Sequence, residues 1–233
     1  MKIRKQFISA ALLAAGLGAG LAHATPISLT KLGGTTGGTI AATAVFRADL
    51  STAAIGTLQS ITIRDNSAGL GGSPGRFSGF DLDAIILSSD SCDTANCVAG
   101  LSPLSAFNYS SGVIFTPGVQ RDPADPKLFG TGPTGSTVDN AVATLGLFDG
   151  ESTAGSGADG FLSLGDGGRI SFNLSSALST SGLYLYLGEV GDNGEALAGE
   201  ITISQNPVPE PVSLSLLAIG LAGLGIGRRA RRA

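Results

Sequence analysis

Short segments in which apolar and polar residues alternate, separated by glycine and proline, run through most of this 233-residue chain. In one of them Ile61 and Ile63 alternate with Thr62 and Arg64, and this period of two places the isoleucines on one face of a β-strand. The other clear segments are 80–87, 169–174, 183–187 and 200–204. The last three place on one face, in turn, Ile170, Phe172 and Leu174, then Leu183, Leu185 and Leu187, then Ile201 and Ile203. No amphipathic helical pattern extends convincingly beyond two turns, so residues 25–207 are expected to form an all-β, two-sheet β-sandwich of jelly-roll or Greek-key type.

Glycine-rich turns and loops are expected between these strands. The sequence Gly-Asp-Gly-Gly at 165–168 predicts a hairpin turn between strands at 161–164 and 169–174, because glycine and aspartate tolerate positive φ. A second turn of the same chemistry is predicted at 191–194. Long flexible loops are expected at 33–39, 68–75 and 152–160. Strict alternation in the strand at 80–87 would place four apolar residues on one face, namely Phe80, Leu82, Ala84 and Ile86.

Residues 1–24 have the three parts of a secretory signal peptide. A positively charged start is followed by an uncharged apolar run at 7–21. Ala22 and Ala24 then supply the small residues that signal peptidase needs, which makes Thr25 the expected first residue of the mature protein. The apolar run is shorter than the roughly 20 residues of a bilayer span, so we expect cleavage, with an uncleaved anchor helix as the alternative.

Cleavage would remove His23, which is the only histidine of the chain. The Gly-x-Ser-x-Gly pattern at 71–75 is therefore interpreted as a loop and not as a hydrolase nucleophile, because a nucleophilic serine needs a base. Pro74 also has no N–H to donate to an oxyanion. Residues 25–207 carry seventeen acidic and seven basic side chains, and this negative charge is expected to exclude nucleic acid as a partner.

Cys92 and Cys97 are the only cysteines of the chain. In an exported protein, two cysteines this close together predict a disulfide. Metal binding is the weaker alternative, because no histidine or second cysteine pair is available to complete a site. Closing so short a loop removes little chain entropy, so the disulfide is expected to fix a turn.

The C-terminal segment 208–233 combines three features in a fixed order. Val208 precedes the triplet Pro209, Glu210 and Pro211, and an uncharged run follows at 212–227. A basic cluster ends the chain and consists of Arg228, Arg229, Arg231 and Arg232. As a helix the run would be about 24 Å long, and snorkelling arginines can make up the difference to the hydrocarbon core. The positive-inside tendency predicts that the basic cluster lies in the cytoplasm.

This tail resembles the PEP-CTERM sorting signal of Gram-negative bacteria, whose carriers are typically substrates of exosortase, a membrane-embedded cysteine transpeptidase found alongside exopolysaccharide gene clusters. The resemblance implies that the Pro-Glu-Pro triplet is the recognition element. It also implies transient anchoring in the inner membrane, removal of the helix and arginines, and sorting to the surface or extracellular matrix. A plain C-terminal anchor is the alternative. Residues 161–172 and 183–195 also resemble the bodies of other proteins with this tail, which commonly have β-sandwich-like domains.

Close pairs of acidic residues, such as Asp81 with Asp83, are expected to be solvated turn residues. Calcium is a further interpretation for one group of acids. Residues 154–162 nearly match the calcium-binding nonapeptide Gly-Gly-x-Gly-x-Asp-x-apolar-x. Asp159 of this loop, together with the nearby Asp149 and Glu151, is therefore a candidate calcium site.

Tyr184 and Tyr186 share the face opposite the leucines of their strand. Exposed tyrosines could stack on sugars, and the alternative is that both rings complete a second apolar layer of the sandwich.

These features together predict a non-enzymatic surface or matrix protein with a structural or interaction role in the exopolysaccharide or biofilm layer. A calcium-dependent carbohydrate-binding module with the same tail is the alternative, and a hydrolase that uses two carboxylates alone is a third reading. The expected partners are signal peptidase and exosortase during export, the membrane through the C-terminal helix, and exopolysaccharide afterwards.

Overall fold

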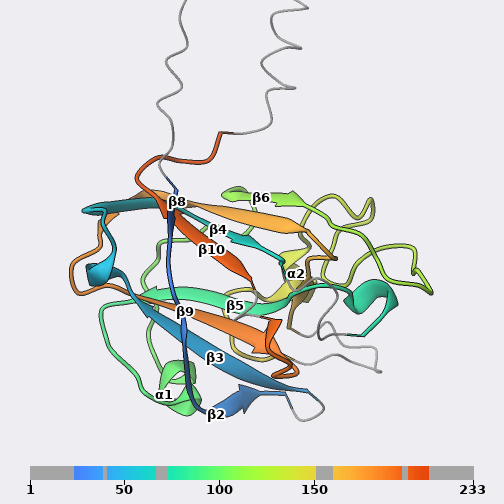
Figure 1. Cartoon of the computed structure of the whole chain (residues 1–233), viewed down its shortest axis with the longest axis horizontal. Helices are drawn as coiled ribbons and strands as arrows, with labels where there is room; N and C mark the ends of the chain where they lie inside the picture. Colours follow the sequence, from blue (N-terminus) through green and yellow to red (C-terminus); the bar gives the residue numbers. More distant parts are fainter. Residues whose placement is uncertain (1–23, 39–40, 67–72, 151–159, 196–198, 210–233) are drawn as a thin grey trace, which may run out of the picture.

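A computed structural model describes residues 24–38, 41–66, 73–150, 160–195 and 199–209. The described chain forms two antiparallel five-stranded sheets, which are the upper and lower layers in Figure 1. The first sheet contains, in spatial order, β1 (Thr25–Pro26), β10 (Glu200–Ser204), β4 (Thr57–Arg64), β8 (Arg169–Ser179) and β6 (Val113–Thr116). The second contains β2 (Thr30–Gly37), β3 (Ala42–Asp49), β9 (Tyr184–Val190), β5 (Asp81–Ser88) and β7 (Leu162–Ser163).

Apolar side chains from both sheets meet in one core cluster. Ile61 and Ile63 on β4 of the first sheet are fully buried there, as are Phe46 on β3 and Leu187 on β9 of the second sheet. Each such side chain contributes about 1.5–3 kcal/mol by leaving water. The predicted inward positions of β4, β8, β9 and β10 are confirmed, and the fold is β-sandwich-like.

The face predicted for the strand at 80–87 is wrong in its second half. Opposite β9, the register of β5 shifts by one residue between Leu82 and Ile85, which is a β-bulge. Leu82, Ile85 and Leu87 therefore face the shared core, whereas Ile86 joins a second apolar cluster on the outer face of the sheet. An inserted residue inverts a period-two pattern, so alternation alone could not place Ile86.

The predicted hairpin at 165–168 is also wrong, because the strands on its two sides belong to different sheets. β7 pairs with β5, whereas β8 pairs with β4 and β6. The segment is a tight crossing in which an added Cβ at Gly168 would lie 1.9 Å from the carbonyl oxygen of Leu164, so only glycine fits. The turn at 191–194 is confirmed, with positive φ at Gly191 and Asp192, and it too leads from one sheet to the other.

The helices among the described residues are short. They are α1 (Ala95–Ala99), α2 (Asn140–Ala143), and the 3₁₀ helices η1 (Leu50–Thr52) and η2 (Gly75–Phe77). Of the predicted loops, 33–39 is largely wrong because its first five residues belong to β2, and most of 68–75 and 152–160 lies outside the described residues. Within the described ranges, no helix has both the length and the apolar character needed to cross a bilayer. The predicted signal peptide up to residue 23 and the predicted tail helix at 212–227 fall outside those ranges.

Candidate functional site

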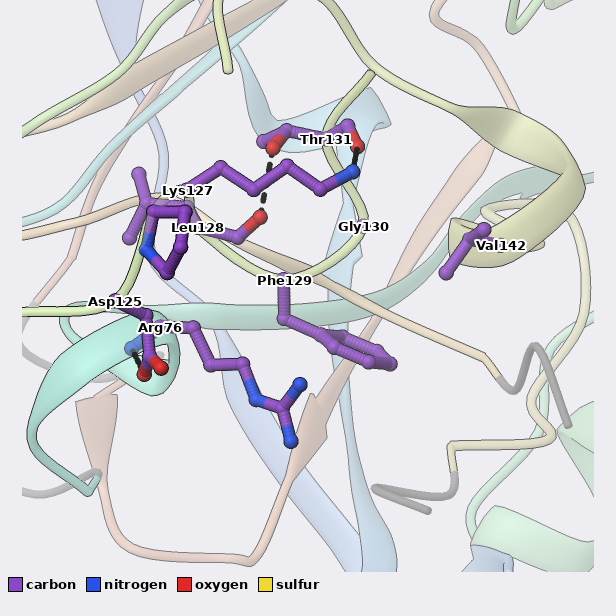
Figure 2. A pocket seen from close by; sticks show the side chains of 9 residues that line it. Arg76, Asp125, Lys127, Leu128, Phe129, Gly130, Thr131 and Val142 are labelled. Atoms are coloured by element: carbon purple, nitrogen blue, oxygen red, sulfur yellow. Dashed lines mark hydrogen bonds between the residues drawn. The ribbon is translucent and has the colours of Figure 1, made fainter. Parts of the chain in front are cut away.

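A pocket with a cavity of about 320 Å³ lies between the segment 125–131, Arg76 of η2 and Val142 of α2 (Figure 2). Its walls are mainly apolar and include Leu128 and Phe129. A concave, largely apolar site of this size with few polar groups is typical of a site for a small ligand.

Phe129, which lines the pocket, belongs to a cluster of three phenylalanines. The ring centroids of Phe77 and Phe129 lie 5.4 Å apart, and those of Phe129 and Phe161 lie 4.5 Å apart. Phe161 is buried, whereas Phe77 and Phe129 are half-buried. The buried ring fixes the two outer rings, so Phe129 presents a rigid apolar surface to the cavity.

Arg76 is held in place through its main chain and its aromatic neighbours. Its N–H donates to Asp125 Oδ2 at 2.8 Å, and its carbonyl oxygen accepts from the N–H of Phe129 at 2.9 Å. The guanidinium carbon lies 4.9 Å from the ring centroid of Phe77 and 6.0 Å from that of Phe129, within the range of cation–π attraction. Arg76 lines the pocket, and its guanidinium donates no hydrogen bond to any of the residues that the structure describes.

Charge is distributed unevenly around this pocket. Four of the seven basic side chains in residues 25–207 form ion pairs with carboxylates, namely Lys31–Asp192, Arg47–Asp93, Arg64–Glu200 and Arg121–Asp166. Arg76 and Lys127 both line the pocket, and neither forms an ion pair with any residue of the described chain. Lys127 Nζ donates to the carbonyl oxygens of Thr131 and Gly132, which leaves its charge uncompensated. The pocket therefore combines apolar walls with two cations on an acidic protein.

A second group of titratable residues is buried in the sandwich. Asp81, Asp83 and Glu195 are 6%, 0% and 1% exposed, so the expectation that the first two are solvated turn residues is wrong. Burial, together with the neighbouring Glu195 carboxylate, raises the pKa of Asp81 well above its usual range. Burial also raises the pKa of Asp83 and of Glu195 to about 8. Burial thus favours the neutral form of all three carboxyl groups.

Asp81, the first residue of β5, lies next to Glu195. Asp81 N–H donates to Glu195 Oε2 at 3.3 Å, and the Asp81 carboxylate accepts from the hydroxyl of Ser163. Asp81 also borders a smaller cavity of about 240 Å³, together with Phe77 and Asn193. Glycosidase carboxyl groups must face the scissile bond of a bound sugar, whereas Asp81 and Glu195 are only 6% and 1% exposed.

Only one of the three predicted calcium ligands lies in the described chain. Asp149 accepts a hydrogen bond from the hydroxyl of Thr144 at 2.9 Å and lies close enough to Asp83 to raise its pKa. Glu151 and Asp159 lie outside the described residues. In the ranges that the structure covers, no three histidine, cysteine or acidic side chains are arranged to hold a metal ion.

The predicted disulfide between Cys92 and Cys97 is present, with Cα atoms 5.6 Å apart. Its loop contains the start of α1, which Thr94 caps by accepting from the N–H of Cys97. Helix α1 packs on the outer face of the second sheet, where Tyr186 is buried.

Tyr186 is part of a second apolar layer, which confirms that interpretation and excludes its exposure to sugars. Its side chain is 0% exposed, and its hydroxyl accepts from the N–H of Cys92 and donates to the carbonyl oxygen of Asp90, both at 2.8 Å. Tyr184 is half-buried against the same cluster, with Arg47 5.9 Å from its ring centroid.

The body and the predicted sorting tail meet at residue 208. The N–H of Val208 donates to Asn173 Oδ1 at 2.7 Å, and Asn173 Nδ2 donates to the Val208 carbonyl oxygen at 3.0 Å. Pro209, the next residue, is exposed. Of the predicted cleavage residues, Ala24 is exposed and Thr25 pairs with Ile203 in β1–β10. Ala22, Glu210, Pro211 and the four arginines of the basic cluster lie outside the described residues.

The Arg76 pocket could not be predicted from the sequence, because its residues come from separate segments that carry no known motif. The one available signal was the position of two basic residues, Arg76 and Lys127, in a strongly acidic chain. No protein-family model matches the chain, and neither the curated proteins nor the solved structures contain a significant match to it.

Proposed function

We propose that this chain is an exported, non-enzymatic surface or matrix protein that an exosortase sorts through its C-terminal tail. The observation that carries the proposal is the order of the Pro-Glu-Pro triplet, the apolar run and the arginine cluster within the segment 208–233. The contacts of Val208 support it, because two hydrogen bonds hold its main chain immediately before the exposed Pro209. The triplet therefore begins at the surface of the folded body, where an enzyme in the membrane can reach it.

Two features of the body support export. The Cys92–Cys97 disulfide is typical of proteins that mature in oxidising compartments. The surplus of acidic residues favours solubility outside the cell and disfavours binding to nucleic acid. The strand orders β1-β10-β4-β8 and β3-β9-β5-β7, with β6 and β2 as additional edge strands, support a jelly roll as the finer description of the fold.

Mass spectrometry of both ends of the protein from its bacterial host tests the proposal. We expect the wild-type protein to begin at Thr25 and to lack the arginine cluster in the surface or matrix fraction. The Glu210→Ala variant should keep its tail and stay in the membrane fraction, whereas Glu200→Ala, an exposed change on β10, should be processed normally. Wild-type protein found in the cytoplasm with both ends intact would refute sorting.

Calcium-dependent carbohydrate binding is a second candidate, which a specific observation favours. Asp83 Oδ1 is buried without a hydrogen-bond partner in the described chain, and Asp149 lies beside it. A hard cation shared by these carboxylates would neutralise both. Calorimetric titration with Ca²⁺ should then give heat and a raised melting temperature, both reduced in Asp149→Asn, and a glycan array should lose signal on chelation. Titration without heat or thermal shift would exclude this candidate.

A further inference from the structure

We propose that the Arg76 pocket binds a carboxylated sugar, that is, a single uronic acid unit. In this assignment Arg76 pairs with the sugar carboxylate, and the apolar face of the ring lies on Phe129. The inference goes beyond sorting, because it concerns what the folded body recognises once it has been delivered.

The charge of the ligand follows from the two uncompensated cations. The guanidinium of Arg76 is planar and matches a carboxylate in bidentate geometry, and its stacking on Phe77 fixes its orientation. Lys127 adds a second positive charge at the same pocket. Elsewhere in the described chain basic side chains are paired with acids, except for Arg169 on the exposed start of β8. Within the described chain, the pocket is therefore the place where two unpaired cations lie together and attract an anion.

The shape of the ligand follows from the walls of the cavity. About 320 Å³ is at the lower end of the range for small-molecule sites, which suits one ring better than an extended chain. Leu128, Phe129 and Val142 offer apolar contact on the inner side. The C–H face of a pyranose ring packs on such a surface, whereas a free phosphate would leave it uncovered.

Asp125 distinguishes a sugar from an apolar carboxylate. One of its oxygens accepts from the Arg76 N–H, and the residue lines the pocket beside that bond (Figure 2). A carboxylate oxygen next to a bound ring accepts hydrogen bonds from hydroxyl groups, which a uronic acid supplies and an aromatic acid lacks. The negative charge of Asp125 also repels a bound anion, and hydroxyl groups that donate hydrogen bonds to Asp125 offset this repulsion.

Calorimetric titration of the full-length chain with galacturonate, galactose and benzoate tests the assignment. Galacturonate and galactose differ only at C6, which is a carboxylate in the first and a hydroxymethyl group in the second. Benzoate keeps a carboxylate but carries it on an aromatic ring without hydroxyl groups. We expect galacturonate to bind with a dissociation constant of about 1 mM or tighter, and the other two at least about tenfold more weakly. Equal affinity for galactose would overturn the role of charge, and equal affinity for benzoate would overturn the choice of a sugar.

Variants with the same net charge locate the site. Arg76→Gln should lower the affinity for galacturonate at least about tenfold, whereas Arg169→Gln, which also removes one exposed cation, should leave it unchanged. Arg76→Lys, which keeps the charge but loses the planar fork, should give an intermediate loss. Unchanged melting temperatures establish that the variants are folded, since Arg76 is exposed. Equal losses in Arg76→Gln and Arg169→Gln, or no binding of galacturonate by the wild-type chain, would refute the proposal.

Discussion

The side-chain amide of Asn173 on β8 forms two hydrogen bonds with the main chain of Val208, one to its N–H and one to its carbonyl oxygen. This pairing imitates a neighbouring strand and fixes the last residue before the Pro-Glu-Pro triplet. Replacing Asn173 with alanine removes both bonds, and we expect a loss of about 1 kcal/mol in the free energy of unfolding. Limited proteolysis followed by mass spectrometry should show faster cleavage around residues 205–209.

A matched variant separates the two bonds. Asn173→Asp keeps the acceptor for the Val208 N–H but loses the donor to its carbonyl oxygen, so its cleavage rate should lie between those of the wild type and Asn173→Ala. Identical rates in all three proteins would show that the pairing does not hold the tail.

Tyr186 should contribute to stability through its hydroxyl group. Tyr186→Phe removes two hydrogen bonds and leaves the N–H of Cys92 buried without its partner, so we expect a loss of about 1–2 kcal/mol in denaturant unfolding. Tyr184→Phe is the control, because Tyr184 contributes mainly its ring to the same cluster. Its effect should be a few tenths of a kcal/mol, and an equal loss in both variants would contradict the role of the Tyr186 hydroxyl.

Stability should fall as the pH rises from about 4 to 8. Burial raises the pKa of Asp83 and Glu195 from 3.8 and 4.5 to about 8, so the folded protein keeps protons that the unfolded chain releases. Their contribution is fully present below the unfolded pKa values and is lost as the pH approaches the folded values. We expect a melting temperature several degrees lower at pH 8 than at pH 5.

Neutral amides provide the control for this pH dependence. Asp83→Asn removes one of the three buried carboxyl groups whose pKa is raised, and it should flatten the curve of melting temperature against pH. Asp90 is exposed and contacts Tyr186 through its main-chain carbonyl oxygen, which Asp90→Asn retains. This variant should therefore leave the slope unchanged. A wild-type curve that is flat or rises toward pH 8 would mean that these carboxyl groups are ionised in the folded state.

Loss of the disulfide should weaken the body only modestly. The Cys92→Ser, Cys97→Ser double variant opens the short loop between two cysteines that are five positions apart, and the chain-entropy rule gives about 2 kcal/mol. We expect the lower stability in chemical denaturation and faster hydrogen exchange in α1, with little change in the shared core. Equal acceleration of exchange across both sheets would show that the bond supports the whole fold.

The sequence was informative wherever a strand keeps strict alternation with one face on the shared core. Ile61, Ile63, Ile170 and Phe172 are such residues, and all four are buried as predicted. The pattern failed at β5, where a bulge reverses which alternate residues face the shared core. The outer face of this strand is also covered by the second apolar cluster. It also failed at 165–168, because turn chemistry reports local φ values and not which sheet the next strand joins.

The candidate site was harder to predict than the fold. Arg76, Asp125 and Val142 are far apart in sequence, and only the packing of η2 and α2 against the segment 125–131 brings them together. Burial of Asp81 and Asp83 could not be foreseen either, since two aspartates separated by one residue are usually solvated. Such sites depend on long-range contacts that leave no periodic signal.

The pairing of Thr25 with Ile203 has a consequence for how the protein matures. From β3 onward each successive strand joins the opposite sheet, so most contacts join distant parts of the chain and folding is intrinsically slow. In a chain exported as proposed, β1 emerges first and its neighbour β10 emerges last. The first sheet can therefore be completed only when translocation is nearly finished, because β10 lies between β1 and β4 and reaches them after every other strand has emerged.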